Sequence, residues 1–243
     1  MTRRFRMVAG PNGSGKTTLA ARLANDYSVN FYTMLNADDV FAVVSRSRAW
    51  FPPFPITGDA LAAYASRTSY AESEKRRFSS GEISVDDDCV RFLAPESVNS
   101  YTVALLVNFM QDEFISRGIS FSQETVFSHP SKVAALAKAH AAGFRTYLYF
   151  ISTDDPEINV GRVANRHAQG GHDVPDAKIR TRYARSLENA AAALPHLSRA
   201  FFFDNSGTEM RYLASYSEGG GFELEAGGAD GAPRWFNRLL AGA

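Results

Sequence analysis

Residues Gly10 to Thr17 are the feature that most constrains this fold. They fit the pattern GxxxxGK[ST] and read Gly10-Pro11-Asn12-Gly13-Ser14-Gly15-Lys16-Thr17. A short apolar stretch, Phe5 to Ala9, precedes them and is typical of a buried strand, and the helix-forming residues Thr18 to Ala24 follow. A glycine-rich turn between a strand and a helix directs backbone N–H groups and the positive end of the helix at an anion. The pattern therefore predicts a phosphate cradle.

Two side chains at the end of this loop complete the expected nucleotide site. Lys16 can reach the β- and γ-phosphates, and the Thr17 hydroxyl can hold Mg²⁺. We therefore expect ATP and Mg²⁺ as cofactors. We expect the nucleotide to bind at Gly10, Pro11, Asn12, Gly13, Ser14, Gly15, Lys16, Thr17 and Thr18.

Composition narrows the class of protein. The chain has 243 residues, 45% of them hydrophobic, which suits one α/β domain with a large core. Its formal net charge is zero, and this argues against a nucleic-acid binder or a membrane-surface binder, because both usually carry a basic excess. Cys89 is the only cysteine in the sequence, so no internal disulfide can form, and we expect a cytoplasmic protein.

Strands and helices are expected to alternate along most of the chain. The pattern indicates strands at 5–9, 31–35, 119–124, 144–152 and 200–203, and helices at about 15–26, 40–47, 131–142, 156–168 and from 175 onward. This alternation predicts a mostly parallel, doubly wound sheet with helices on both faces. Residues 210–217 and 221–225 resemble a hairpin around Gly219-Gly220, and 233–240 a terminal helix, within a C-terminal region of about 208–243.

Residues of about 50–95 are interpreted as a largely helical insertion into a single domain that spans 1–243. Three prolines within 52–55 exclude a helix there, and 59–77 has a helical pattern with a charged, solvated end at 72–77. Residues 79–88 are polar and typical of a loop, and Pro95 opens a helix that Gly118 ends. The aromatic residues and prolines of the insertion suit either a substrate wall or a partner surface.

Candidate catalytic carboxylates follow two of the expected strands. Asp38 and Asp39 come directly after 31–35, at the carboxyl edge where open α/β sheets bind ligands. One of them can accept the proton of an acceptor hydroxyl; the alternative, stronger for Asp39, is a cap for the helix that begins at Val40. Glu124 ends its strand and can bind a substrate hydroxyl or a metal-bound water, or be a plain loop carboxylate. Thr125 and Ser128 add hydroxyls to the same substrate pocket, and Asp39 is expected to contact the substrate as well.

A basic segment at about 162–185 is a candidate lid over ATP. It holds six lysines and arginines against two aspartates. Arg162 and Arg166 are four residues apart and share a helix face, and Gly170-Gly171 provides a hinge beside them. Arginines that meet a transferring phosphoryl group accelerate the reaction strongly. The alternative is a solvated basic face, and it fits Lys178 and Arg180 best.

The order of these motifs resembles that of zeta-toxin-like P-loop kinases, in the branch often labelled predicted ABC-type ATPase. The resemblance covers about 1–47 and 119–206. It is carried by the phosphate loop with Thr18, Asn36-Ala37-Asp38-Asp39, Glu124-Thr125-Val126-Phe127-Ser128, Arg162-Val163-Ala164-Asn165-Arg166, Gly170-Gly171-His172-Asp173-Val174-Pro175, Arg182-Tyr183-Ala184-Arg185-Ser186-Leu187 and Asp204-Asn205-Ser206.

The resemblance implies a kinase that phosphorylates a sugar nucleotide, UDP-N-acetylglucosamine in the known toxins, on the 3′-OH of the amino sugar. It implies that Asp38 is the catalytic base, that Glu124 binds substrate and that Arg162 and Arg166 belong to the lid. It also implies a toxin with an antitoxin-like protein partner. The chain departs from the family in three places: Gly171-His172 replaces an arginine of the second lid segment, and neither 50–95 nor the C-terminal hairpin has a counterpart.

The rival interpretation is an ABC-type or repair-type ATPase that couples hydrolysis to conformational change. The same phosphate-loop sequence is common in those ATPases. In addition, residues 78–82 (Phe-Ser-Ser-Gly-Glu) faintly resemble the LSGGQ signature. That signature must open a helix and precede an apolar strand ending in Asp-Glu. Here the polar residues 83–88 follow, and Asp204 is succeeded by Asn205. The kinase is therefore favoured, and ATP turnover that requires a small-molecule acceptor distinguishes the two.

Overall fold

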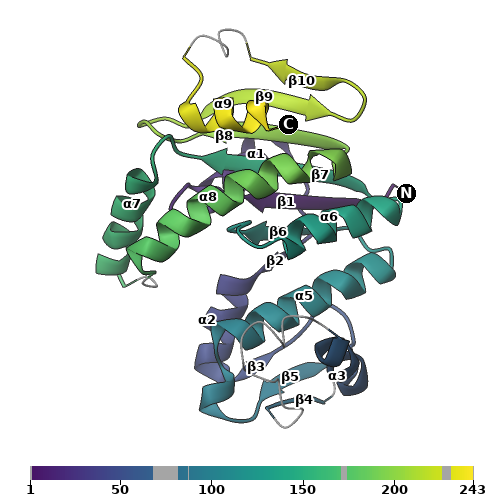
Figure 1. Ribbon diagram of the computed structural model, residues 1–243. Coiled ribbons are helices and arrows are strands. Elements are labelled where there is room, and N and C mark those ends of the chain that lie inside the picture. The colour runs from purple at the N-terminus through teal and green to yellow at the C-terminus, as the bar shows by residue number, and fades with distance from the viewer. Residues whose placement is uncertain (1, 68–81, 87, 171–173, 226–230, 243) are drawn as a thin grey trace. The chain divides into compact units, whose positions relative to one another are not determined.

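The computed structural model describes residues 2–67, 82–86, 88–170, 174–225 and 231–242. By internal contacts the chain divides into two compact units, residues 1–34 with 118–243 and residues 35–117 (Figure 1). The assignment of 1–243 to a single domain stays a prediction. Across the described ranges, every helix is too short or too polar to cross a lipid bilayer.

A seven-stranded sheet organises the larger unit, and β1 is near its middle. Its order is β10-β9-β8-β7-β1-β6-β2. β1 pairs in parallel with both β6 and β7, β7 pairs in parallel with β8, and the hairpin β9–β10 adds an antiparallel edge. The expected mostly parallel α/β fold is thereby confirmed, as is the C-terminal hairpin. The strands are β1 (Arg4–Ala9), β2 (Thr33–Asn36), β6 (Phe121–Thr125), β7 (Arg145–Ser152), β8 (Arg199–Asp204), β9 (Arg211–Ser217) and β10 (Gly221–Leu224).

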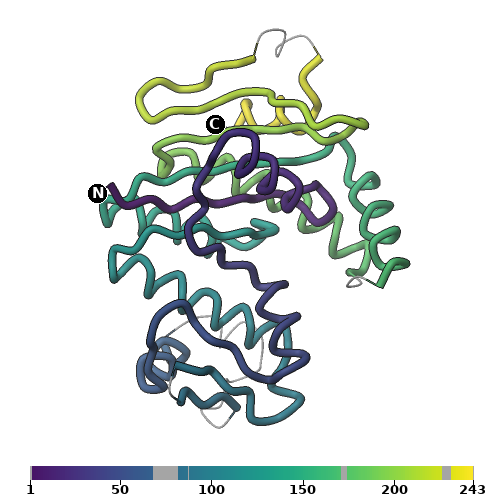
Figure 2. The backbone as a smooth tube through the Cα atoms, turned by 180° about the vertical axis from the view of Figure 1, so that it is seen from behind, coloured from purple at the N-terminus to yellow at the C-terminus, as the bar shows by residue number. Residues whose placement is uncertain are grey.

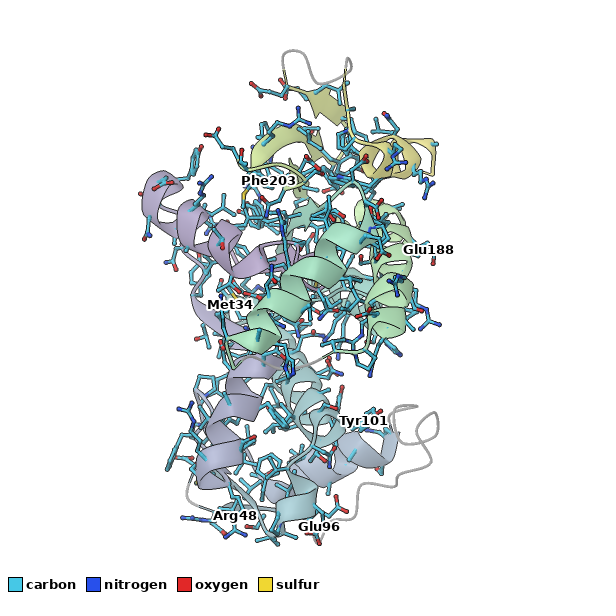
Figure 3. All side chains as sticks on the ribbon, turned by 90° about the vertical axis from the view of Figure 1, so that its left-hand side faces the viewer. Met34, Arg48, Glu96, Tyr101, Glu188 and Phe203 are labelled. Atoms are coloured by element: carbon cyan, nitrogen blue, oxygen red, sulfur yellow. The ribbon has the colours of Figure 1, made fainter. Side chains whose placement is uncertain are left out.

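Helices lie on both faces of this sheet. In Figure 1, α6, α8 and α9 lie on the near face, and Figure 2 shows α1, in purple, on the opposite face. Glu188 points outward from the exposed side of α8 (Figure 3). The helices of this unit are α1 (Lys16–Tyr27), α6 (Ser131–Ala141), α7 (Pro156–Ala168), α8 (Asp176–Ala193) with the short 3-10 turn η2 (Leu194–His196), and α9 (Arg234–Ala241).

Aromatic side chains fill the core between the sheet and the near-face helices. The ring of Phe5 stacks on that of Phe121 at 4.2 Å between centroids. Trp235 of α9 packs against Phe150, and Phe236 packs against Phe202. All of these side chains are fully buried, so the apolar stripe of α9 holds the expected terminal helix on the sheet.

Residues 35–117 form the second unit, which contains more helix than strand. Its elements are α2 (Ala37–Ser47), β3 (Ala49–Trp50), α3 (Gly58–Arg67), β4 (Ile83–Asp86), β5 (Cys89–Phe92), the 3-10 turn η1 (Pro95–Ser97) and α5 (Ser100–Ser116). Strands β3, β5 and β4 make an antiparallel sheet. No helix crosses the prolines at 52–55, as expected.

Three details of this unit differ from the sequence expectations. The polar loop expected at 79–88 is wrong for 83–86, which form β4, because Ile83 is buried and pairs opposite Phe92. Pro95 opens only a 3-10 turn, and Asn99 caps the long helix that follows. The expected helix at 59–77 begins at Gly58 and is seen to Arg67; the charged run 72–77 and most of the LSGGQ-like segment lie outside the described residues.

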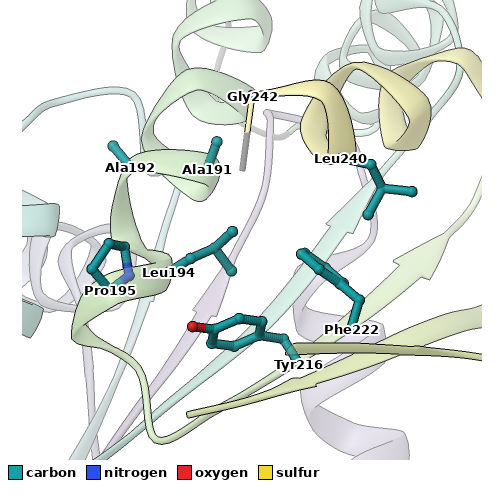
Figure 4. Close-up of a pocket in the computed structure, with 8 residues that line it drawn as sticks. All are labelled: Ala191, Ala192, Leu194, Pro195, Tyr216, Phe222, Leu240 and Gly242. Carbon is teal, nitrogen blue, oxygen red and sulfur yellow. The ribbon is translucent and has the colours of Figure 1, made fainter. Parts of the chain in front are cut away.

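A pocket of about 500 Å³ lies between the end of α8, η2, the terminal hairpin and α9 (Figure 4). Its wall includes the side chains of Leu194, Tyr216, Phe222 and Leu240. It is lined by no Asp, Glu, His, Lys or Arg, so it lacks the charged groups that phosphate chemistry requires.

Candidate functional site

The phosphate loop joins β1 to α1 at the carboxyl edge of the sheet, as the sequence predicts. Gly10 has a φ of +152°, and a Cβ there would collide with the carbonyl oxygen of Ile151. Gly15 precedes α1 with a φ of +99°, and its Cβ would come within 2.6 Å of the Asn205 amide. Glycine is required at both positions because any side chain would push the loop away from its neighbours.

Two asparagines from distant segments brace the loop backbone. Asn205, just beyond β8, donates from Nδ2 to the carbonyl of Ser14 at 2.8 Å. Asn159 of α7 donates from Nδ2 to the carbonyl of Asn12 at 2.5 Å, and its own Oδ1 accepts from the Thr153 hydroxyl. The carbonyls of Ser14 and Asn12 therefore point away from the centre of the loop and are bonded to side chains. This arrangement leaves loop N–H groups free to bind an anion.

Lys16 and Ser14 place polar groups within the loop. The Lys16 ammonium donates to the carbonyl of Pro11 at 3.0 Å, so its charge lies inside the turn. Ser14 is fully buried, and its hydroxyl has no hydrogen-bond partner among the described residues. A buried hydroxyl without a partner is costly. Together with the cationic amine, it fits a site that is completed by a phosphate.

Glu124 lies beside Thr17. The pairing of β1 with β6 sets Val8 opposite Glu124, and the Thr17 hydroxyl donates to the two carboxylate oxygens at 3.1 and 3.3 Å. A hydroxyl and a carboxylate are the oxygen ligands that Mg²⁺ takes in nucleotide sites, where it also keeps water and phosphate ligands. The donor set at this edge therefore fits the expected cation.

The residues after Glu124 shape a tight turn. The Thr125 hydroxyl accepts from the backbone N–H of Phe127, a buried residue with a φ of +64°. Ser128 is half-buried beyond it. His129 Nδ1 lies 2.8 Å from the Ser131 hydroxyl at the start of α6. The substrate roles of Thr125 and Ser128 stay predictions.

Two arginines reach the loop from the basic segment, and they come from different helices. The backbone of α7 packs on Gly13, where a Cβ would touch the Cβ of Arg162 at 3.4 Å. Arg162 Nη2 donates to the carbonyl of Gly207 at 3.5 Å, whereas its Nη1 is buried with no partner among the described residues. Arg182 of α8 donates from Nη1 to the Asn12 side chain at 3.5 Å. Two cationic groups thus lie beside the cradle.

The other cations of this segment lie further out. Arg166 is exposed in the last turn of α7. Arg180 is bound to the Glu157 carboxylate at 2.6 and 2.9 Å, and this hydrogen-bonded pair lowers the pKa of Glu157. The solvated interpretation thus fits Arg180. Residues 171–173, which belong to the expected hinge and to the GGHDVP motif, lie outside the described residues.

Asp38 and Asp39 belong to the second unit and are both exposed in the first turn of α2. The Asn36 side chain, not an aspartate, caps this helix by accepting from the N–H of Asp38 at 3.0 Å, so the alternative that Asp39 is the cap is wrong. Desolvation and the charge of Asp38 raise the pKa of Asp39. The roles of Asp38 as base and of Asp39 as a substrate contact stay predictions.

Three residues of the site were given no individual role from the sequence: Asn159, Asn205 and Arg182, which was counted only among the cations of the candidate lid. Only Asn159 leaves a local signal, because it lies one turn from Val163 on the buried stripe of α7, where an apolar residue is usual. The other two reach the loop through the tertiary fold.

The fold is shared with solved structures of low sequence identity. A chain of the crystal structure of AvrRxo1-ORF1:-ORF2 with ATP is 16% identical, with a TM-score of 0.59; the match covers 98% of the present chain and 63% of that one. A chain from the PezAT chromosomal toxin–antitoxin system of Streptococcus pneumoniae is 13% identical, with a TM-score of 0.51, and the match covers 86% and 72% of the two chains. This chain therefore spans less than two thirds of the AvrRxo1 chain.

Sequence comparison gives a family. No curated protein sequence matches the chain. The family model described as AAA domain matches residues 6–188, from β1 through most of α8, and so includes the phosphate loop, Glu124 and both arginines beside the loop. Because this match covers well over half of the chain, the protein belongs to the AAA domain family.

Proposed function

We propose that this protein is an ATP-dependent phosphotransferase. It moves the γ-phosphate of Mg-ATP to a hydroxyl of a small acceptor, a sugar nucleotide such as UDP-N-acetylglucosamine. The contact between Thr17 and Glu124 is the observation that carries the proposal most directly. It supplies a carboxylate beside the hydroxyl that ends the phosphate loop, and phosphoryl transfer needs a cation held at that point.

The residues of the larger unit divide the work of binding ATP. The loop N–H groups and the Lys16 ammonium hold the phosphates, while Arg162 and Arg182 bring positive charge from α7 and α8. Of the roles that the sequence allowed for Glu124, we propose that it binds a water ligand of the metal. Mg²⁺, when bound, neutralises charge on the phosphate oxygens.

Asp38 is the proposed general base. It removes the proton from the acceptor hydroxyl as the phosphoryl group arrives, which is how a positioned carboxylate assists this reaction. Its exposed position in the first turn of α2 leaves the carboxylate accessible to a substrate. The sugar nucleotide and its 3′-OH rest on the resemblance to zeta-toxin-like kinases.

The solved neighbours support a biological setting for the reaction. One comes from a complex of two proteins with ATP, and another from a toxin–antitoxin system. We therefore propose that this kinase acts as a toxin and that an antitoxin-like protein is its partner.

An ATPase that moves or reshapes a partner is the alternative. It would use Asp204, the acid that ends β8, as its metal-binding carboxylate. However, β8 is separated from β1 by β7, and the buried Asp204 carboxylate accepts from Trp235 Nε1 at 3.0 Å and from the Ser206 hydroxyl at 2.7 Å. The Asp204 carboxylate therefore helps to hold α9 in place rather than being available to a metal ion, and these observations favour the kinase.

A labelled-phosphate experiment tests the proposal. The purified protein is incubated with Mg²⁺ and γ-labelled ATP, with and without UDP-N-acetylglucosamine, other sugar nucleotides and a metabolite extract. We expect label to move to a sugar nucleotide whose mass rises by one phosphate. ATP hydrolysis at the same rate with and without every acceptor would instead establish the ATPase.

A further inference from the structure

The sheet face that α1 covers bears a cluster of arginines and aromatic rings at the amino ends of its strands. Register places Arg4 beside Arg145, and it places Arg6, Tyr147 and Arg199 in one row across β1, β7 and β8. We call Arg4, Arg6, Arg145 and Arg199, with Tyr32, Tyr147 and Phe201, the arginine face. Leu19 and Leu23 of α1 pack further along the strands, against Val8, Tyr149 and Ile151.

The guanidinium groups of this face are stacked on aromatic rings. Arg6 lies 5.3 Å from the ring centroid of Tyr32 and 5.0 Å from that of Tyr147. Arg145 lies over the ring of Tyr147 at 5.7 Å, and Arg199 lies over that of Phe201 at 5.3 Å. Stacking fixes the plane of a guanidinium group, and the exposed Arg145 and Arg199 keep N–H edges available to a second partner.

Tyr32 is held in an unusual conformation to complete this arrangement. Its φ is +54°, in the left-handed region, and its N–H donates to the Asn30 side chain at 2.8 Å. Its hydroxyl accepts from Arg4 Nη1 at 3.4 Å. A bulky residue adopts this backbone only at a cost, and such strain clusters at binding sites.

The positive charge of the arginine face is not neutralised within the described residues. None of its four arginines forms an ion pair with a described carboxylate, although Arg117, Arg180, Arg211 and Arg234 all do. Glu223 of β10 shares the face by register, yet no ion pair joins it to an arginine. Nε and Nη1 of Arg6 are buried without a hydrogen-bond partner. Four like charges this close repel one another, and an anion would relieve the repulsion.

We infer that the arginine face is a docking surface for an acidic polypeptide segment of a partner protein. Arginine edges pair with carboxylates in a bidentate geometry, and a row from β1 to β8 spans about 10 Å, which suits carboxylates spaced along an extended chain. A nucleic acid fits less well. The ring faces it would stack on already carry guanidinium groups, and the chain has no net positive charge.

This surface is separate from the phosphate loop. Arg6 precedes Gly10 by four residues of β1, roughly 13 Å along the strand. Docking here therefore does not depend on the phosphotransferase proposal, and substitutions on the face should leave ATP binding unchanged.

Fluorescence anisotropy with labelled poly-glutamate tests the inference at low and moderate salt, with a single-stranded oligonucleotide of equal charge as the competitor. The test variant is Arg145→Gln with Arg199→Gln, two exposed positions. The matched control is Lys138→Gln with Arg238→Gln, which removes two exposed charges from helices on the opposite face. Arg145→Lys with Arg199→Lys keeps the charge and removes the bidentate geometry. Circular dichroism and ATP affinity verify that each variant is folded.

We expect the parent and the control to bind poly-glutamate with a salt-sensitive affinity, the double glutamine variant to bind at least about tenfold more weakly, and the lysine variant to fall between. Three results would overturn the inference: no binding by the parent, equal binding by the folded glutamine variant and the control, or tighter binding of the oligonucleotide, which would make this a nucleic-acid surface.

Discussion

The hydroxyl of Thr17 lies 3.1 Å from Oε1 of Glu124 and so joins the first turn of α1 to the end of β6. The two residues are 107 positions apart in the sequence and meet because β6 pairs directly with β1. A substitution of either Thr17 or Glu124 should therefore weaken binding of the same Mg²⁺ ion.

Glu124→Gln should weaken Mg²⁺ binding and leave the fold intact, because the amide keeps the shape and loses the charge. Groups that orient a metal and its water typically change metal affinity about 10–100-fold, and we expect a shift of that size in the Mg²⁺ concentration for half-maximal turnover. Thr17→Ala should shift it in the same direction. Titration of Mg²⁺ at saturating ATP measures both, with the exposed Glu225→Gln as the control; unchanged Mg²⁺ dependence in both variants would remove Glu124 from the site.

Lys16→Ala should abolish phosphoryl transfer and weaken ATP binding, because the ammonium no longer neutralises the β- and γ-phosphates. The helix should persist, since alanine is a good helix former. Initial rates, calorimetric ATP affinity and thermal unfolding provide the measurements. A folded Lys16→Ala protein with parental activity contradicts the phosphate-loop assignment.

Asp38→Asn should reduce transfer to the sugar nucleotide by about 10²–10⁴-fold, the usual contribution of a general base. ATP affinity should barely change, because Asp38 is not part of the phosphate loop. Asp39→Asn is the matched control and should do less. Initial rates and ATP affinity of both variants decide the matter: an inactive Asp39→Asn beside an active Asp38→Asn means that the base is the other carboxylate.

Arg162→Ala and Arg182→Ala should each reduce kcat strongly, by about 10²-fold or more, because both guanidinium groups lie at the loop. Arg166→Ala should cost less, since its side chain is exposed. Hydrogen exchange with and without an ATP analogue adds a second measurement, in which α7 and α8 should gain protection. Equal rates in all three variants, or unchanged exchange throughout 162–185, would exclude the lid.

Lys132, in the first turn of α6, should make stability depend on pH. Desolvation lowers the pKa of its amine from 10.5 to about 8. Between these values the unfolded chain binds more protons than the folded one, so the free energy of unfolding contributed by this group rises with pH; below pH 8 its penalty is present in full.

Lys132→Met should therefore raise Tm at pH 7, and its advantage over the parent should shrink as the pH rises from 8 to 10. Lys138→Met, an exposed position in the same helix, is the control and should show no such trend. Thermal unfolding across this pH range provides the comparison. A Tm difference between Lys132→Met and the parent that stays constant contradicts the shifted pKa.

Local patterns predicted the phosphate loop and the mostly parallel character of the large sheet, because a glycine-rich turn and alternating strands and helices leave few alternatives. They did not predict the strand order, in which β6 lies between β1 and β2. The alternative that Asp39 caps α2 was wrong because Asn36, Asp38 and Asp39 all suit a cap, and only the structure shows that the Asn36 side chain accepts from the N–H of Asp38. Strand β4 was missed because its few apolar residues become buried only once β5 pairs beside it.

The residues that brace the phosphate loop could not be predicted from the sequence for a different reason. Asn205 and Arg182 contact Ser14 and Asn12 across 191 and 170 residues. Such contacts depend on which strand follows which in the sheet, and no short-range pattern encodes them.

The bond from Asn205 to Ser14 has a consequence for synthesis of the protein on the ribosome. The phosphate loop is made well before β6 and β7, the two strands that pair with its strand β1, and its last brace arrives with residue 205. A nascent chain therefore leaves β1 unpaired until residues 121–152 have emerged, and the loop is fully braced only after residue 205. If the product harms the cell, as proposed, its toxicity begins only after that residue has left the ribosome.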